Sequence, residues 1–561
     1  MKQALIFTGL IILSLSVFSQ SKNNPTVLTI GEHNYTVGEF WHIYNKNKDL
    51  SSFTETPEQF ADRFTNYKLK VVDAIKLKLD TISDFVEEYS KYAEDLAAAY
   101  LIDSAAIEQA ARSAHYNMTK LASAAHILVM LPRNRPATPA DTLTAWNKIS
   151  EAREKAMAGE DFNELAVEYS EDPSVAQNRG ELGYFSAFQM VYPFEKAAFS
   201  TPIGNISEII RSPFGYHIVK VNDIKPNPGR IKVAHIMKQF PRELTPEIEK
   251  IMESSIDSIY GLLLNGEDFA ELAKQFSDDK QSGAKGGEMQ PLFLGQIPVF
   301  TDEAFKLTKD GETSAPVKTP YGWHIIRRLE LIPIEDYQTA YQNIITMMAR
   351  DERGQAGNTA FINKKRNSAA FKINKPVFNE ISALANDIEI NNDFFGKISQ
   401  SDNRTLYEYE NIKVTVTQFL EYLKNDKSFV VSEGIISVEK AMNRQASEII
   451  MKEEKQNLPI KTPEYLYLAN EYYDGLLIFE LSHNKIWSQV GADTVALYEH
   501  YLNYASDFSE NGELIPYEDC KGEVMNSYQA KMEADWINDM RKKYNPTFNY
   551  KLLKNKKYRN N

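Results

Sequence analysis

The chain has 561 residues, 43% of them hydrophobic, which supports several folded cores and excludes a disordered chain. Its formal net charge of −14 argues against a general nucleic-acid-binding protein and is compatible with a soluble partner of other polypeptides. The one cysteine, Cys520, excludes an internal disulfide. We interpret it as a small buried residue rather than a nucleophile, because no residue around it supplies a base.

Residues 1–19 have the pattern of a secretory signal peptide. Met1–Gln3 is short and basic, and Ala4–Phe18 is an apolar run of about 15 residues, which suits a signal-peptide core and is short for a membrane span. A buried N-terminal helix is the alternative. No cysteine follows the run, so we expect an exported mature chain without a lipid anchor or an integral membrane span.

Residues 26–120 predict a mainly helical module. Two strand-like pieces, Val27–Gly31 and Tyr35–Phe40, lead into Phe60–Tyr116, which is almost continuously compatible with helix. Apolar residues recur there near the 3.6-residue period, so we expect helices with one apolar face each.

A repeat occupies the middle of the chain. The pieces Ala-His-Ile, Gly-Glu-Asp-Phe and Gly-Tyr-His-Ile (Gly-Trp-His-Ile in the second copy) recur in the same order, and His324 stands 107 residues after His217. This period is too long for a solenoid unit and matches a small independent domain. We therefore expect two sister domains, at residues 121–226 and 229–332.

The first repeat predicts an α+β domain, because strand and helix patterns alternate within about 100 residues. We expect a buried strand at 124–130, helices at 142–157, 162–169 and 194–199, a glycine-hinged loop at 179–183, and two strands within 206–221.

Residues 335–403 predict a helical connector that begins with one long helix, Glu335–Lys365. Residues 404–561 predict a C-terminal helical module. Within it, Thr415–Phe419 resembles Thr36–Phe40 at a displacement of 379 residues, so we expect the two ends of the chain to build related modules.

A basic tail closes the sequence. From Arg541 onward it holds lysines and arginines with no acidic residue, and Thr547–Tyr550 alternates like a strand. We expect this strand to dock on another part of the chain. The alternative is a tail that binds lipid headgroups or polyanions.

Taken together, the repeated motifs resemble the parvulin family of peptidyl-prolyl cis/trans isomerases. The motifs that carry the resemblance run in the order His-Ile-Leu, Glu-Asp-Phe-x-x-Leu-Ala, Tyr-Ser-Glu-Asp, Gly-Glu-Leu-Gly, Gln-Met, Pro-Phe-Glu-x-Ala-Phe, Gly-x-x-Ser and Phe-Gly-Tyr-His-Ile. The whole arrangement is similar to the SurA-type periplasmic chaperone-isomerases. This resemblance implies a multidomain α+β fold, with two parvulin-like domains between helical modules, a periplasmic location and no cofactor or metal.

The resemblance also implies site residues. In the first domain these are the catalytic residues His126, Asp172 and His217 and a proline pocket lined by Leu182, Met190, Phe194 and Phe199. In the second domain they are His235, Asp279, Met289, Phe300, Phe305 and His324. The segment 287–300 of the second copy is one residue shorter than 180–194 and has Gln296–Ile297 where the first copy has Gln-Met, without a clear equivalent of Met190.

We expect His126 and His217 to hydrogen-bond each other at the pocket floor, with Asp172 tuning its polar wall. The structural alternative is a pair of core histidines that hold two strands together. A zinc site of His126, Asp172 and His217 is conceivable, but the flanking strands are apolar and no further ligand recurs. A serine hydrolase would need a nucleophile-elbow sequence, which is absent beside these residues. A phosphate-binding loop would need a terminal Lys-Ser/Thr pair, which the glycine-rich segments lack.

The implied function is an exported peptidyl-prolyl cis-trans isomerase (EC 5.2.1.8) with chaperone activity. It would isomerise X-Pro bonds by non-covalent stabilisation of the twisted amide, in unfolded or nascent exported polypeptides, above all outer-membrane proteins. The alternative is a non-catalytic holdase that uses the parvulin domains as peptide-binding modules. The sequence does not indicate an oligomeric state.

Overall fold

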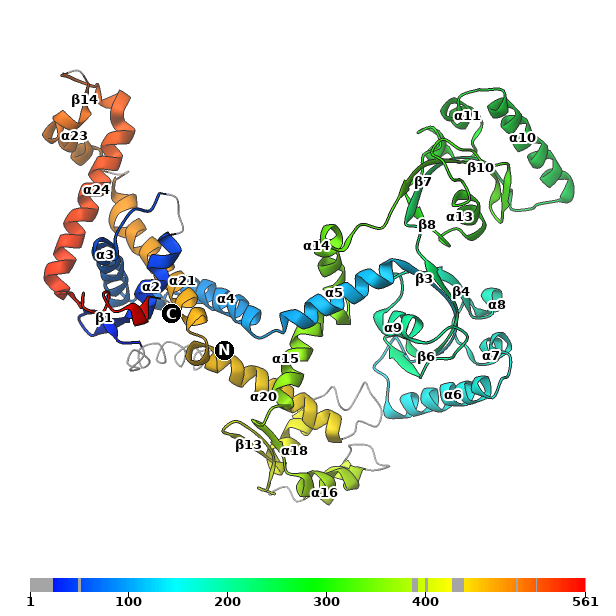
Figure 1. Ribbon diagram of the computed structural model, residues 1–561, viewed down its shortest axis with the longest axis horizontal. Helices are drawn as coiled ribbons and strands as arrows, with labels where there is room; N and C mark the ends of the chain where they lie inside the picture. The colour runs from blue at the N-terminus through cyan, green and yellow to red at the C-terminus, as the bar shows by residue number, and fades with distance from the viewer. Residues whose placement is uncertain are drawn as a thin grey trace. The chain divides into compact units, whose positions relative to one another are not determined.

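The computed structural model describes residues 24–48, 52–385, 392–398, 402–425, 438–490, 493–510 and 512–559 (Figure 1). The expected signal peptide lies outside these ranges. The chain forms two compact units, one of Met1–Leu101 with Met451–Asn561 and one of Ile102–Ile450. The stretch expected as one C-terminal module, 404–561, is thus divided between the two units. Within the described ranges, no helix combines the length and hydrophobicity that a membrane span requires.

The first unit is built around a small sheet that joins distant parts of the chain. Its order is β16-β1-β2, with strands Thr547–Phe548, Thr26–Ile30 and His33–Thr36. Leu28 of β1 pairs with Phe548 of β16, and the Phe548 ring packs edge-on against Phe40 at 5.7 Å. The expected docking of the tail strand is confirmed.

Helices complete this unit. They are α2 (Val37–Lys48), α3 (Pro57–Lys76), η1 (Leu79–Thr81), α4 (Ser83–Tyr100), α21 (Pro463–Ser482), η3 (His483–Trp487), α22 (Ser488–Val490), α23 (Thr494–Asn503), η4 (Ala505–Phe508), α24 (Tyr517–Tyr544) and η5 (Lys556–Tyr558), with the hairpin β14 (Ser509–Glu510) and β15 (Glu513–Leu514). Helix α21 packs on α3 and α4, where the rings of Tyr92 and Tyr472 stack at 3.7 Å. Cys520 is buried in the core of this unit.

A buried cation ties the N-terminal segment of the first unit to the C-terminal segment. The side chain of Lys68 on α3 is 1% exposed and pairs with both Glu39 on α2 and Asp474 on α21. The rings of Tyr35 and Tyr67 flank its ammonium group. Because a charge buried at this depth is stable only when paired, these three elements must assemble together.

The 379-residue similarity predicted from the sequence is confirmed by the structure. Displacing β1 and β2 by 379 residues gives the bounds of β12 (Thr405–Tyr409) and β13 (Ile412–Thr415), and each hairpin runs directly into a helix, α2 or α18 (Val416–Asn425). Each hairpin also gains a third strand at the same edge, β16 on β1 and β11 (Phe371–Ile373) on β12. The second copy packs with α16 (Lys375–Ala385), α17 (Asn392–Lys397) and α20 (Val438–Lys461).

The first central domain is a four-stranded antiparallel sheet, in the order β4-β3-β6-β5, that is covered by helices. Its elements are β3 (Lys120–Met130), α6 (Pro139–Met157), α7 (Phe162–Tyr169), α8 (Val175–Asn178), β4 (Glu181–Phe185), α9 (Tyr192–Ser200), β5 (Ile210–Ser212) and β6 (Gly215–Pro226). Part of the loop expected at 179–183 is instead strand β4, because its backbone pairs with the edge of β3. Thr138 and Asp141 form a capping box that starts α6.

The second central domain repeats this topology in the order β8-β7-β10-β9. Its elements are β7 (Arg230–Gln239), α10 (Pro246–Leu264), α11 (Phe269–Phe276), α12 (Lys280–Gly283), β8 (Leu292–Phe293), α13 (Pro298–Ala304), β9 (Val317–Thr319) and β10 (Gly322–Ile332). Gly215 and Gly322 open the long return strands with φ of 151° and 152°, and a Cβ at either would lie 2.1 Å from a carbonyl oxygen of the neighbouring strand. Both copies therefore require glycine in the Gly-x-His motif.

Three helices of the second unit form a scaffold beside the first central domain. They are α5 (Ser104–Met118), α14 (Tyr337–Met348) and α15 (Ala356–Arg366). The expectation of one long helix over Glu335–Lys365 is wrong, because the chain turns through η2 (Glu352–Gln355) between α14 and α15. Asp351 caps this turn by accepting a hydrogen bond from the backbone of Arg353.

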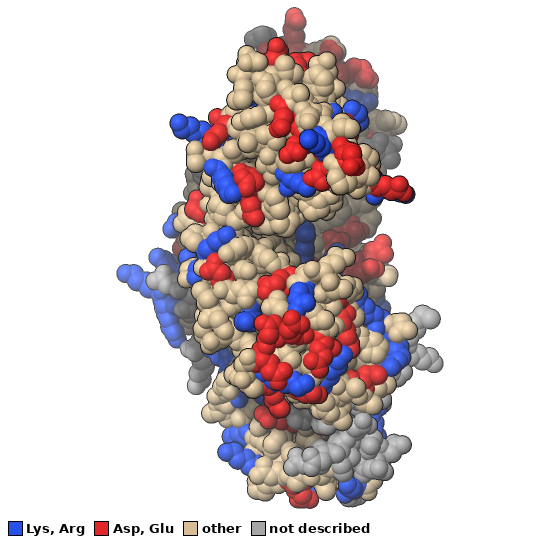
Figure 2. Space-filling model, turned by 90° about the vertical axis from the view of Figure 1, so that its right-hand side faces the viewer, with Lys and Arg blue, Asp and Glu red and all other residues tan. Residues whose placement is uncertain are grey.

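The surface drawn in Figure 2 mixes charges of both signs. Blue Lys and Arg side chains lie among red Asp and Glu side chains over this face. The face offers no uniformly basic field of the kind that binds nucleic acid.

Candidate active site

The two histidines of the first central domain lie side by side because of strand register. His126 on β3 pairs with Val219, and His217 on β6 pairs with Leu128, so the histidines are diagonal neighbours on one face of the sheet. Both are buried, and their rings stack with centroids 5.8 Å apart. Helix α9 places Phe194 edge-on against both rings, at 5.7 Å from His126 and 5.8 Å from His217.

The expected hydrogen bond between His126 and His217 is not formed. The Nδ1 atoms of both rings are buried, and neither has a hydrogen-bond partner among the described residues. His217 instead uses Nε2, which lies 2.7 Å from the Ser212 hydroxyl. The Ser212 oxygen also accepts the backbone N–H of Phe214, which fixes its position.

The second central domain does form the histidine pair, within a continuous chain of hydrogen bonds. The two Nδ1 atoms of His235 and His324 lie 3.3 Å apart, His235 Nε2 lies 2.9 Å from the Asp279 carboxylate, and His324 Nε2 lies 2.9 Å from the Thr319 hydroxyl. Asp279 accepts only, so the proton order is set: Thr319 donates to His324, His324 to His235, and His235 to Asp279.

Asp172 stands at the polar edge of the first site. The Asp-Pro turn ends helix α7 and leaves Asp172 half-buried, where it accepts hydrogen bonds from both the backbone and the hydroxyl of Ser174. Its Oδ2 lies 3.1 Å from His126 Nε2. Burial opposes ionisation, but the Ser174 hydrogen bonds and His126 hold the pKa of Asp172 below its ordinary value. The carboxylate is therefore ionised at neutral pH.

The histidines are neutral at the same pH. Burial lowers the pKa of His217 to about 4, His126 adds to the shift, and Asp172 opposes it. Burial also lowers the pKa of His126, against the pull of Asp172. In the second domain burial lowers the pKa of His324 to about 3. Each site thus presents uncharged rings beside one carboxylate.

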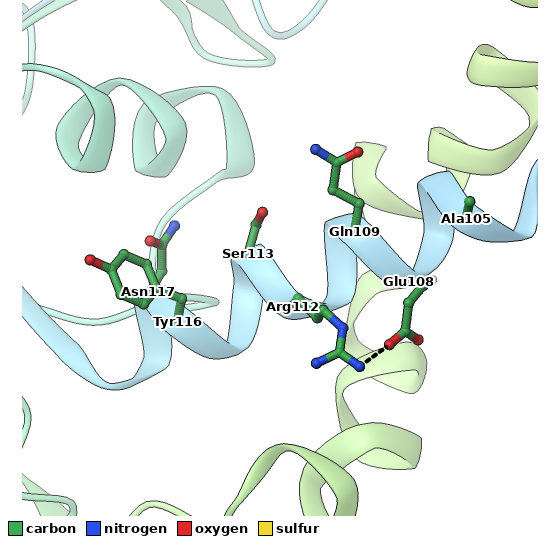
Figure 3. Close-up of a pocket in the computed structure, with 7 residues that line it drawn as sticks. All are labelled: Ala105, Glu108, Gln109, Arg112, Ser113, Tyr116 and Asn117. Atoms are coloured by element: carbon green, nitrogen blue, oxygen red, sulfur yellow. Dashed lines mark ion pairs between the residues drawn. The ribbon is translucent and has the colours of Figure 1, made fainter.

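An apolar wall adjoins the first histidine pair. Phe194 belongs to a core cluster formed by β3, β4, α9 and β6. The other three residues expected to line a proline pocket lie in the same cluster and are partly buried: Leu182, Met190 and Phe199. The structure therefore brings together the seven residues singled out in this domain. A neighbouring hollow of about 530 Å³ along α5 is lined by polar side chains, including the Glu108–Arg112 ion pair, and holds no predicted site residue (Figure 3).

The comparisons with known proteins agree with this geometry. Residues 106–225 and 235–330 each match a family model described as a PPIC-type PPIase domain. Both central domains are parvulin domains. The chain is 33% identical over 37% of its length to "Chaperone SurA" of Nitrosococcus oceani and 34% identical over 41% to that of Hahella chejuensis.

These matches cover only part of each protein. The chain spans about half the length of the curated relatives it matches, 48% and 50% for the two named above. A solved structure of the peptidylprolyl isomerase PrsA from Bacillus anthracis is 28% identical, covers 24% of this chain and 59% of its own, and has a TM-score of 0.17.

The second parvulin domain has no counterpart of Met190. Gln189 and Gln296 occupy the same place, since each side chain accepts a backbone N–H three residues earlier, and Val191 and Ile297 each cap the following helix. Met190 is therefore the one residue that parvulin domain 2 lacks in this segment. Its Phe300 still packs against both of its histidines, while Met289 and Phe305 pack at the edge of the same core.

Two hydroxyl positions of the site were missed by sequence reasoning. Ser212 and Thr319 each bond the second histidine of their domain, and Ser174 and Ser282 each bond the aspartate. The repeat carries a signal for the first pair, because a hydroxyl residue stands five positions before the histidine in both copies.

Proposed function

We propose that this protein is a peptidyl-prolyl cis-trans isomerase that also binds unfolded polypeptides, with parvulin domain 1 as the active domain. One observation carries the proposal: Phe194 packs on two neutral imidazoles, Leu182 and Met190 lie in the same apolar cluster as Phe194, and an ionised Asp172 lies 3.1 Å from His126. The family match of both domains and the printed name of the relatives, Chaperone SurA, support it.

The chemistry asks little of the protein. Rotation about an X-Pro bond faces a barrier of about 18–20 kcal/mol, because the amide loses resonance when it is twisted. Lowering this barrier by about 4 kcal/mol accelerates the exchange roughly a thousandfold. No covalent bond to the substrate is required, only tighter binding of the twisted amide than of either planar form.

Each site residue has a role in this scheme. Leu182, Met190 and Phe194 hold the proline ring by apolar contact. His126 and His217 support Phe194 from below without adding charge, and Asp172 sets the polarity on the side where the carbonyl rotates. A neutral floor suits this task, because a charged imidazolium beneath an apolar ring would be costly to bury.

Parvulin domain 2 is proposed to bind peptides with little or no catalysis. It keeps the histidine pair and Phe300 but lacks the residue that corresponds to Met190. The alternative is a holdase function, in which both domains only bind clients. The missing residue favours this role for domain 2. By likeness to the relatives, the clients are proposed to be exported polypeptides, especially outer-membrane proteins, met in the periplasm.

The test uses the full chain and an Ala-Pro peptide whose cis/trans exchange is followed by NMR line broadening. We expect acceleration by the wild-type protein, and Met190→Ala should reduce kcat/KM several-fold, by up to about tenfold, because part of the apolar contact to the ring is lost. Met289→Ala, a Met-to-Ala change at the position of domain 2 that corresponds to Leu182, is the control and should leave the rate unchanged.

The possible results separate the candidate functions. A folded wild-type protein that does not accelerate the exchange would exclude the isomerase and favour the holdase. Equal rates for Met190→Ala and wild type would show that the proline does not contact Met190. A loss caused by Met289→Ala would place activity in domain 2.

A further inference from the structure

A fully buried carboxylate lies behind the apolar wall of parvulin domain 1. Glu195 follows Phe194 on α9 and is 0% exposed. Its Oε2 accepts the backbone N–H of Phe188 at 2.7 Å. Phe188 has a φ of 65° and begins the segment Phe188–Val191, which carries Met190 into the site. Glu195 therefore fixes the start of the segment on which the proposed proline pocket depends.

The cation that balances Glu195 comes from outside the parvulin domain. Arg353, in the turn η2 between α14 and α15, donates from Nη1 to Glu195 Oε1 at 2.9 Å and from Nη2 to Oε2 at 3.3 Å. Its guanidinium lies over the rings of Phe188 at 3.8 Å and Tyr192 at 4.6 Å. Asp351 accepts from Arg353 Nε and holds the guanidinium in place.

In parvulin domain 2, a residue of the domain itself binds the corresponding backbone N–H, and among the described residues none from the scaffold takes part. Thr301 replaces Glu195 after the pocket phenylalanine, and its hydroxyl accepts the backbone N–H of Gly295 at 3.0 Å, where domain 1 has Phe188. The Thr301 hydroxyl donates in turn to the carbonyl of Ile297. Since a threonine is enough to satisfy this backbone group, the carboxylate in domain 1 adds something else: a link to the helical scaffold.

We propose that Arg353 is a positioning residue for the isomerase site of parvulin domain 1. Through Glu195 it holds the Phe188–Val191 segment, and with it Met190, in the conformation that binds proline, so activity depends on docking of the domain against η2 and its flanking helices. This inference rests on the isomerase function proposed above. It also predicts that domain 1 freed from this scaffold is a weaker enzyme than domain 1 in the full chain.

The surroundings show why the segment would move when Arg353 is removed. A cavity of about 360 Å³ lies beside the ion pair, lined by one face of α5 together with Tyr192, Glu195, Phe199 and Arg353. Without its cation, Glu195 would be a buried charge with one hydrogen bond. If the carboxylate turned toward the cavity, water could solvate its charge. The hydrogen bond to the Phe188 N–H would then break, and the Phe188–Val191 segment would lose its anchor.

The experiment is a double-mutant cycle in the full chain. The variants are Arg353→Met, Glu195→Thr, which copies domain 2, and the two together. We expect Arg353→Met to lower kcat/KM for the Ala-Pro peptide about tenfold and to speed amide hydrogen exchange in residues 186–192. The double variant should regain most of the activity and the protection, because Thr satisfies the Phe188 N–H without a charge.

Matched controls and alternative readouts keep the test decisive. Arg350→Met removes an exposed arginine three residues away and should change neither readout. If Arg353→Met does not fold, Arg353→Lys takes its place, since lysine keeps the charge but loses the two-pronged contact. Thermal unfolding of each variant shows whether a loss of activity follows from a loss of the fold.

The outcomes are distinct. Wild-type activity and exchange in Arg353→Met would overturn the proposal, and so would a double variant as impaired as Arg353→Met, because Arg353 would then act independently of Glu195. If the wild-type protein has no isomerase activity, the proposed function fails. Hydrogen exchange in residues 186–192 then decides alone whether Arg353 positions the segment.

Discussion

Acidification should destabilise parvulin domain 1 through its buried histidines. Burial lowers the pKa of His217 to about 4 in the folded domain, whereas the ordinary value is about 6.5 in the unfolded chain. Between these values the unfolded chain binds a proton that the folded domain does not. The part of the stability that depends on neutral His217 is therefore fully present above pH 6.5 and is lost as the pH falls toward 4. For His217 alone this loss is about 2 kcal/mol at pH 5 and about 3 kcal/mol at pH 4.

The assay is urea unfolding of the full chain at pH 7 and pH 5, followed by pulsed hydrogen exchange in peptides from residues 121–226. The control variant is His217→Gln, whose amide nitrogen can replace the ring Nε2 that faces Ser212. We expect His217→Gln to be less stable than wild type at pH 7 but to lose about 2 kcal/mol less on acidification. Equal stability of the wild-type domain at both pH values would refute the reasoning, as would an unchanged pH dependence in the variant.

Three further predictions concern other parts of the chain. Lys68→Met should lower the free energy of unfolding of the first unit by about 3–5 kcal/mol, because two buried carboxylates lose their cation, and an unchanged urea midpoint would contradict this. Phe548→Ala should cost about 2–3 kcal/mol in the same unit through lost core contacts, measured by thermal unfolding. Insertion of one Met between Gln296 and Ile297 should raise the isomerase activity of a Met190→Ala chain above the residual activity of domain 1. A chain whose activity does not rise after this insertion, with domain 2 folded, would show that more than the missing residue separates the two domains.

Repetition made the central domains predictable from the sequence. Each motif occurs twice, so the paired histidines, the strands that carry them and helix α7 could be placed before the structure was known, and α7 has the expected bounds of Phe162–Tyr169. The weak 379-residue similarity likewise predicted two related helical modules, and in the structure each copy is a hairpin followed by a helix. A pattern that recurs in the chain reports local structure, which depends on neighbouring residues.

The sequence did not predict contacts between residues that are far apart in the chain. Glu195 and Arg353 are 158 residues apart, and Lys68 and Asp474 are 406 apart, so no spacing or period connects them. The expected helix Glu335–Lys365 ran through the turn that holds Arg353, although Asp351, Gly354 and Gly357 around this turn disfavour a helix interior. The missing His126–His217 hydrogen bond depends on small ring displacements, since the centroids are 5.8 Å apart there and 5.5 Å in domain 2, where the bond forms.

The sheet β16-β1-β2 also constrains the order of folding. Strand β1 pairs with β2 on one side and with β16 on the other, so the sheet of the first unit cannot be completed until nearly the whole chain is available for folding. In the sequence, both parvulin domains come after β2 and before β16, so they can fold first from contacts within their own segments. Until the C-terminal strand is available, the edge of β1 opposite β2 is open and the apolar core around Phe40 is incomplete.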